Sequence, residues 1–189
     1  MLGRAGTFPG MPALRTAGMR VALALLVGVA AIIVDAAAAP RNAVTAAAEK
    51  ITPTGVGKVK LGERYTDIRA QHLVRKIGKG CQLAGPNARS APLSAPLKGN
   101  VDFTMNPPRK VADISVRGGA TARGLGIGAT IANIKAAYPK AKVDHSTDHM
   151  FGVTIVRVPK NGGGKLEFAV KTTTHKVVLI GVPFIAFCE

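Results

Sequence analysis

Residues 125–134, LGIGATIANI, decide the fold because they have a counterpart 66 residues earlier, VKLGERYTDI at residues 59–68. When the two stretches are aligned, they share four apolar positions and one glycine: Val59 with Leu125, Leu61 with Ile127, Tyr65 with Ile131, Ile68 with Ile134, and Gly62 with Gly128. Alternating apolar residues are typical of a strand, and the glycine is typical of a turn. The pattern therefore predicts a short strand, a glycine turn and a helix start that occur twice.

The residues after the first stretch predict a helix and then a hairpin. Four apolar residues follow the spacing of one helical face, which predicts a helix over residues 65–77: Ala70, Leu73, Val74 and Ile77. An irregular edge strand is expected within residues 91–97, where two prolines lack a backbone donor. Residues 101–105 and 111–116 are extended runs around a proline-containing loop, so they predict a hairpin with one solvated face.

The second stretch predicts the same order with clearer signals. Thr130 is suited to cap the start of a helix, and Pro139 ends it. Strands are expected at residues 152–158, 165–170 and 177–182. Half of this chain is too short to bury enough apolar surface alone. We therefore expect an α+β fold of two tandem repeats, residues 51–119 and 120–189, each a short strand and helix followed by an antiparallel β-meander, packed as one compact unit.

The N-terminal sequence predicts export from the cell. Three arginines precede an apolar run at residues 21–34, and an alanine-rich segment follows, which together indicate a signal peptide over residues 1–38. The apolar run is shorter than the roughly 20 residues that a membrane-spanning helix needs. We expect a secreted, extracytoplasmic protein with no transmembrane span after cleavage, and a flexible N-terminal segment at residues 39–50.

The chain has two cysteines, Cys81 and Cys188. An exported protein meets an oxidising compartment, in which disulfides form and persist. We therefore expect one disulfide between them, joining the end of the first predicted helix to the last strand. The alternative is a thiol nucleophile at Cys81 with His72 or His145 as its base, which requires a free thiol.

The charge of the chain is strongly positive. Lys and Arg number 26 against 10 Asp and Glu, for a formal net charge of +16 at pH 7. Such an excess attracts polyanions. However, the cations are dispersed along the chain, and with no Trp and two Tyr it lacks the aromatic side chains on which single-stranded nucleic acids stack. We expect no specific nucleic-acid partner, while an anionic cell-envelope polymer remains a candidate.

The segment DHSTDH, residues 144–149, holds the candidate metal ligands: His145, Asp148 and His149. It lies between predicted elements and nothing fixes these side chains on one face, so we expect a solvated loop and no metal site. Residues 124–129, GLGIGA, fit a dinucleotide fingerprint, but the buried strand that should precede it is missing, so we expect no cofactor. No nucleophile with an adjacent base stands out, and we expect no enzymatic activity.

The two matching stretches resemble the repeat unit of a known group of proteins. The residues that carry the likeness are Leu61-Gly62 with Ile68, and Ile127-Gly128 and Thr130 with Ile134. They resemble the tandem-repeat unit of the secreted beta-lactamase inhibitory proteins and of the SmpA/OmlA-type outer-membrane assembly lipoproteins. This resemblance implies a binding role through a concave sheet surface and protruding loops, without assigning contact residues.

From these observations we expect a secreted, basic, non-enzymatic binding protein whose partner is a protein or an anionic envelope polymer. One alternative is an inhibitor of a secreted enzyme. The other is a small metal-dependent hydrolase that uses His145, Asp148 and His149. The sequence assigns no catalytic residue, and it leaves the binding residues and the oligomeric state open.

Overall fold

An eight-stranded antiparallel sheet is the main element of the described part of the chain, which a computed structural model gives for residues 47–159 and 165–187. These residues all belong to one unit that spans Val44–Glu189. Along the chain the strands of this sheet are β4 (Gly78–Lys79), β5 (Arg89–Pro92), β6 (Lys98–Phe103), β7 (Val111–Gly118), β9 (Lys142–Asp144), β10 (Val153–Pro159), β11 (Lys165–Lys171) and β12 (Val177–Val182). Their spatial order, β4-β5-β6-β7-β12-β11-β10-β9, is symmetric about the central pair β7 and β12.

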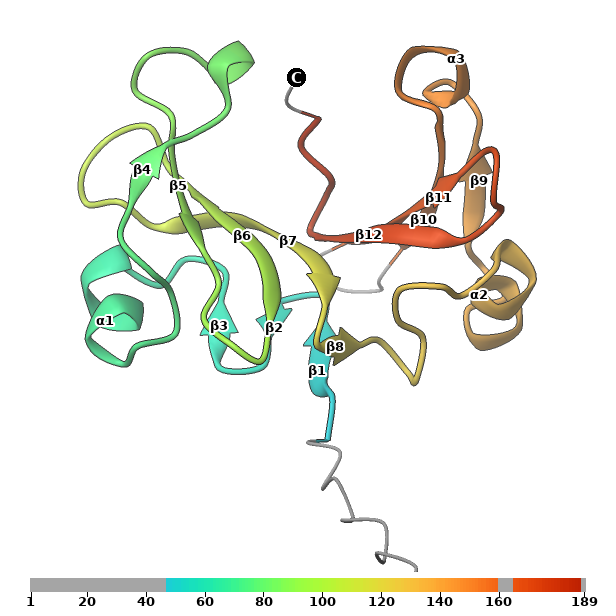
Figure 1. Cartoon of the computed structure of the whole chain (residues 1–189), viewed down its shortest axis with the longest axis horizontal. Coiled ribbons are helices and arrows are strands. Elements are labelled where there is room, and N and C mark those ends of the chain that lie inside the picture. Colours follow the sequence, from blue (N-terminus) through green and yellow to red (C-terminus); the bar gives the residue numbers. More distant parts are fainter. Residues whose placement is uncertain (1–46, 160–164, 188–189) are drawn as a thin grey trace, which may run out of the picture. The chain divides into compact units, whose positions relative to one another are not determined.

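A smaller sheet and short helices complete the unit (Figure 1). The small sheet has the order β3-β2-β1-β8 and contains β1 (Glu49–Thr52), β2 (Gly55–Val56), β3 (Val59–Lys60) and β8 (Ala120–Thr121), with β1 and β8 parallel. The helices are α1 (Tyr65–Ala70), α2 (Ile131–Ala137) and α3 (Asp148–Phe151), and residues Gln82–Ala84 form a single 3-10 turn, η1. Figure 1 shows α1, α2 and the small sheet on one side of the large sheet and the C-terminal segment on the other.

The main apolar core lies between the large sheet, the small sheet and the two longer helices. Its largest fully buried side chains include those of Phe168, Ile114 and Ile180 from the large sheet, together with Ile68 of α1 and Ile134 of α2. A second, smaller cluster lies on the opposite face of the large sheet, where the C-terminal segment covers β10, β11 and β12. The two faces of the large sheet are therefore covered differently.

The two matching stretches of sequence form the same turn in each half. Gly62 and Gly128 both have positive φ, 83° and 90°, which a glycine adopts without steric cost. The backbone N–H of Gly62 donates to the carbonyl of Val111 (2.9 Å), and that of Gly128 donates to the carbonyl of Val177 (2.8 Å). Each turn thus docks the start of its helix onto the first residue of the strand that lies at the centre of the sheet.

The second half follows the sequence prediction closely. Strands β10, β11 and β12 lie where residues 152–158, 165–170 and 177–182 were expected to be extended. Thr130 caps α2 as predicted: its hydroxyl accepts a hydrogen bond from the N–H of Asn133 (3.2 Å), and the Asn133 side chain accepts from the N–H of Thr130 (3.0 Å). Short-range capping signals were sufficient at this position.

The predicted α+β class is wrong, because the described residues are about 43% strand and 15% helix, a mostly β composition. The helix predicted over residues 65–77 ends at Ala70. His72 has a positive φ of 57°, and Val74 then pairs with Leu93 as an isolated bridge. The apolar spacing that predicted a longer helix therefore buries Val74 by strand-like pairing.

The role predicted for a disulfide also needs correction. Cys188 lies outside the described residues, and Cys81 is the one cysteine within them, so no disulfide joins two described residues. In the described chain the two halves are joined through the antiparallel pairing of β7 with β12, in which Val116 lies opposite Ile180 and Ile114 opposite Val182.

Two further differences concern the chain's ends and loops. Strand β1 begins at Glu49, inside the segment expected to be flexible, because the N–H of Glu49 donates to the carbonyl of Gly119 and β1 pairs with β8. The segment expected to be a loop around residues 144–149 contains the start of α3.

The predicted signal peptide, residues 1–38, lies outside the described residues. Within residues 47–159 and 165–187 no helix is long and apolar enough to cross a membrane.

Candidate functional site

The face of the large sheet that turns away from the main core is polar over the first half of the chain. Side chains alternate along a strand, so Asn100 and Asp102 of β6 lie on the face opposite to that of the buried Val101 and Phe103. Cross-strand pairing places Asp102 beside Asp113 of β7, and Asn100 beside Ser115. On β5, Ser90 pairs with Asp102. Three adjacent strands thus bring oxygen-bearing side chains together on one surface.

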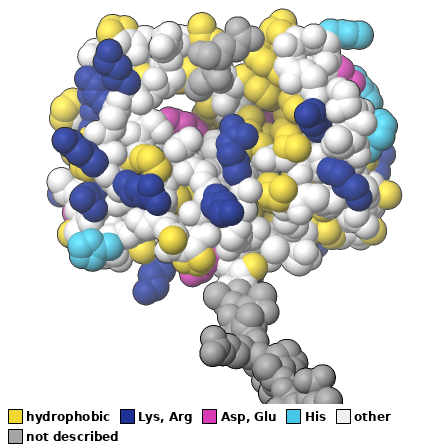
Figure 2. Space-filling model, in the orientation of Figure 1, with side chains coloured by type: hydrophobic (Ala, Val, Ile, Leu, Met, Phe, Trp, Pro, Cys, Tyr) yellow, Lys and Arg dark blue, Asp and Glu magenta, His cyan; other side chains and the backbone are white. Residues whose placement is uncertain are grey.

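Four of these residues, Ser90, Asn100, Asp102 and Ser115, line a cavity of about 520 Å³, whereas Asp113 is buried beside Asp102. Its lining comes from both halves of the chain and comprises Lys79, Gly80, Cys81, Gln82, Ser90, Asn100, Asp102, Ser115, Arg117, Phe151, Val153, Ala169, Val178, Leu179, Ala186 and Phe187. Figure 2 shows a hollow with acidic side chains visible inside it and Lys and Arg side chains spread over the surrounding surface. We call this cavity the concave pocket.

The acidic pair Asp102 and Asp113 lies at the first-half side of the concave pocket. Asp102 is half-buried in the lining, whereas Asp113 is only 5% exposed, and its Oδ1 has no hydrogen-bond partner. Directly opposed residues of an antiparallel pair have Cβ atoms about 4.5–5.5 Å apart. Burial first, then the charge of Asp102 and a hydrogen bond with it, together raise the pKa of Asp113 from 3.8 to about 7.

Neither carboxyl of this pair has a cationic partner within the described residues. The ion pairs there involve other acidic groups, namely Asp144, Asp148 and Glu167. Lys79 and Arg117 line the same pocket, but both are exposed and neither lies within 4.0 Å of an oxygen of the pair. Within residues 47–159 and 165–187, the most buried carboxyl, that of Asp113, therefore has no cationic partner.

The C-terminal segment covers the same face over the second half. Ile185 packs with Ile155, Ala169 and Leu179 in the smaller apolar cluster. Its backbone N–H donates to Oε2 of Glu167 (3.0 Å), and Oε1 of Glu167 accepts a hydrogen bond from Nε of Arg157 (3.1 Å). Glu167 is 7% exposed. This one buried carboxylate therefore binds the backbone of the C-terminal segment and also forms an ion pair with Arg157 of the neighbouring strand β10.

Two exposed apolar side chains flank the concave pocket. Leu83 lies in η1, between β4 and β5, and is 74% exposed; Met150 lies in α3, between β9 and β10, and is 72% exposed. In the symmetric order of the large sheet these two connections are equivalent, since each follows an edge strand. We call Leu83 and Met150 the apolar tips.

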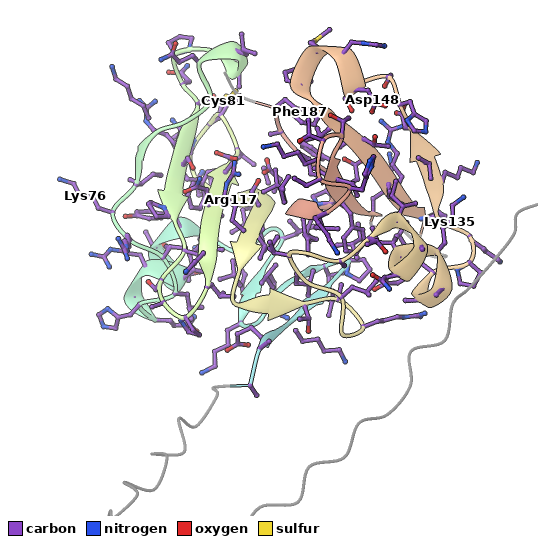
Figure 3. All side chains as sticks on the ribbon, turned by 45° about the vertical axis from the view of Figure 1, so that its right-hand side comes forward. Lys76, Cys81, Arg117, Lys135, Asp148 and Phe187 are labelled. Atoms are coloured by element: carbon purple, nitrogen blue, oxygen red, sulfur yellow. The ribbon has the colours of Figure 1, made fainter. Side chains whose placement is uncertain are left out.

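The end of the C-terminal segment lies between the connections that carry the apolar tips. The ring of Phe187 stacks on the ring of Phe151 in α3, with centroids 4.3 Å apart and an interplanar angle of 14°. Its carbonyl oxygen lies 4.0 Å from Sγ of Cys81, which precedes η1. Figure 3 shows Cys81 and Phe187 close together between the two halves, with Arg117 on the central strand β7. The pocket and the tips therefore form one continuous surface.

The candidate metal ligands do not converge. Nδ1 of His145 lies 2.8 Å from Oδ2 of Asp148, and the Thr154 hydroxyl donates to the other oxygen, Oδ1, at 2.8 Å. These hydrogen bonds, the one with His145 first, lower the pKa of Asp148. Across the described ranges no three His, Cys, Asp or Glu side chains are grouped as a metal ion requires. Asp148, the first residue of α3, instead links His145 to Thr154.

We expect isothermal titration with zinc to show no saturable heat. The reason is that His145 and Thr154 already engage both oxygens of Asp148, which leaves no preformed set of ligands. Asp148→Asn is the control. Stoichiometric zinc binding to the parent that this variant loses would contradict the structural role of Asp148.

A second cavity, of about 590 Å³, lies on the other side of the second half. It is lined by Lys50, Ile51, Thr52, Pro53, Arg123, Tyr138, Lys140, Val158, Pro159 and Leu166. Three of these side chains are exposed cations, and Arg123 lies over the ring of Tyr138, 4.8 Å from its centroid. None of the residues that line this cavity is a buried charged group. The cavity therefore restricts the chemical nature of a ligand less than the concave pocket with its acidic pair does.

Comparison of the chain with family models, with curated proteins and with solved structures finds no match. The function must therefore be inferred from the geometry of the chain itself. Sequence reasoning did not single out Asp102, Asp113, Leu83 or Met150. The alternation of Asp113 and Ser115 with apolar residues predicted a solvated face of the sheet. The pairing of Asp113 with Asp102, however, depends on a register shift between β6 and β7 that cannot be read from the sequence.

Proposed function

We propose that the protein is a non-enzymatic binding protein, secreted as its N-terminal sequence predicts, that docks a protein partner over the concave pocket. The observation that carries this proposal is the placement of the apolar tips. Leu83 and Met150 lie on equivalent connections at either side of one polar hollow. Single exposed apolar residues are ordinary on a protein surface, but two that flank the same cavity offer paired anchors for a partner.

A protein fits this surface better than an anionic envelope polymer does. A polyanion is bound through closely grouped cations, whereas Figure 2 shows Lys and Arg side chains spread over the visible surface. The carboxylate of Asp102 lies in the pocket lining with Asp113 buried beside it, and these two acidic groups would repel a polyanion. Apolar tips beside a polar pocket instead match the mixed character of protein interfaces.

The alternative functions receive different support. An inhibitor of a secreted enzyme is one form of the proposed protein binder, and its partner would be that enzyme. The hydrolase alternative has less support, because His145 contacts Asp148 but no hydroxyl or thiol within the described residues is hydrogen-bonded to its other ring nitrogen. A histidine without a nucleophile in reach does not form a catalytic pair.

The test is a capture experiment with the mature chain as bait on envelope and culture-medium fractions of the producing cells. We expect the double variant Leu83→Asp, Met150→Asp to lose at least about tenfold of the affinity for the captured protein, because each substitution places a charge where an apolar anchor is buried by the partner. Binding is then quantified with the purified partner.

Ile127→Asp serves as the matched control, since Ile127 is also exposed and apolar but lies in the turn before α2. It should retain the affinity of the parent. Equal affinities of the parent and the double variant would show that the apolar tips are not the docking surface, and the proposed function would then be wrong.

A further inference from the structure

The acidic pair is the feature of the concave pocket that most restricts which ligand can bind there. Asp113 has an oxygen without a partner, is almost fully buried and points, by strand alternation, to the face that lines the pocket. Its neighbour Asp102 is in the lining itself, and no cation of the described chain pairs with either. An uncompensated buried carboxyl is costly, so a ligand that supplies positive charge at this point gains more than it would on the open surface.

We infer that the concave pocket receives the guanidinium group of an arginine side chain presented by the docked protein. The group would lie against Asp102, beside which Asp113 is buried, between the apolar tips. This inference rests on the docking role proposed above and names the chemical feature of the partner that the pocket selects.

Guanidinium suits the pocket better than an ammonium group or a divalent metal ion. It is planar and has five N–H donors, which can bind the carboxylate of Asp102 in the lining and still reach further acceptors. Such acceptors are present, because the side chains of Ser90, Asn100 and Ser115 line the pocket on the same strands. A metal ion instead needs ligands grouped at coordination distance, and none of the His, Cys, Asp and Glu side chains in the described ranges form a group of three.

The charged residues of the pocket lining further restrict which protein segments can bind. Lys79 and Arg117 are exposed cations of the lining, so they repel a partner that carries only positive charge around its arginine. They attract carboxylates placed beside that arginine. The positive net charge, +16 for the full sequence and +14 without Arg4, Arg15, Arg20 and Asp35 of the predicted signal peptide, also favours the approach of an acidic surface. The partner segment that fits is therefore an arginine flanked by Asp or Glu.

The test uses a small probe with neutral ends, N-acetyl-arginine amide, titrated into the intact mature chain at pH 8 and followed by amide chemical shifts. We expect saturable shifts at residues 90, 100, 102, 113 and 115. N-acetyl-citrulline amide, which has the same shape without the charge, should bind at least tenfold more weakly. Asp102→Asn should weaken the arginine probe by a similar factor while its unbound spectrum remains that of a folded chain.

Further titrations separate this inference from the docking role. The double variant Leu83→Asp, Met150→Asp should bind the arginine probe like the parent, even though it loses the captured protein. If the probe binds but the tips prove unimportant for capture, the docking role fails and the guanidinium site stands. Equal binding of arginine and citrulline probes, no binding of either, or displacement of the arginine probe by calcium through the same residues would overturn the guanidinium site.

Discussion

Asp113→Asn is expected to stabilise the folded protein by about 2–4 kcal/mol at pH 8 and to change its free energy of unfolding little at pH 4. Burial and the neighbouring Asp102 raise the pKa of Asp113 from its ordinary value of 3.8 to about 7. At pH 8 the folded chain therefore holds a buried negative charge beside a second one. An asparagine removes that charge, and its amide can donate to Asp102.

The free energy of unfolding should fall as the pH rises, because the folded chain binds a proton at Asp113 more tightly than the unfolded chain does. Between pH 4 and pH 7 the folded chain keeps a proton on Asp113 that the unfolded chain has lost, because the pKa of the folded state is the higher one. This group therefore contributes stability at low pH that disappears as the pH rises through about 7. The difference between variant and parent should grow over that interval and become constant above it.

Urea unfolding at several pH values from 4 to 8 measures this difference. Asp67→Asn is the matched control, since Asp67 is an exposed carboxyl in the first turn of α1. It should shift the free energy of unfolding by no more than about 0.5 kcal/mol. A stabilisation by Asp113→Asn that is the same at pH 4 and pH 8 would show that the charge of Asp113 is not its cause.

The parts of the fold that the sequence predicted correctly depend on local signals. Thr130 caps α2 through contacts within one turn, and β12 occupies the predicted residues because its apolar run follows a polar segment and ends before Pro183. The glycine turns at Gly62 and Gly128 are local as well. Each of these features is determined by neighbours within a few residues, which periodicity and turn chemistry detect.

The parts that the sequence did not predict depend on contacts between distant residues. Helix α1 ends early because the segment after it is hydrogen-bonded to the end of β5. The N–H of Arg75 donates to the carbonyl of Pro92, and the N–H of Ser94 donates to the carbonyl of Leu73. Tertiary pairing overrides the helical spacing there. The acidic pair likewise depends on the register of β6 against β7, which shifts between Asp102 and Phe103. A shift of one residue moves a side chain to the opposite face, so the site could not be located from the sequence.

Glu167→Ala is expected to destabilise the folded protein by about 3 kcal/mol, because a buried backbone donor loses its acceptor and an ionic hydrogen bond is lost as well. The N–H of Ile185 donates to Glu167, and Ile185 packs into the smaller apolar cluster over β10, β11 and β12. Loss of this hydrogen bond should release the C-terminal segment. Urea unfolding measures the free energy, and hydrogen exchange of the Ile185 amide reports the release.

Two companion variants separate the contributions of Glu167. Glu167→Gln retains an acceptor for the N–H of Ile185, so we expect it to cost only about 1 kcal/mol. Arg157→Ala removes the ion pair alone, and because Arg157 is half exposed the loss should stay within about 1 kcal/mol. If Glu167→Ala costs no more than Glu167→Gln, and the Ile185 amide exchanges as slowly as in the parent, then packing of the apolar cluster holds the segment and the carboxylate does not. The concave pocket would in that case owe the position of its Phe187 wall to apolar contacts such as the stack on Phe151.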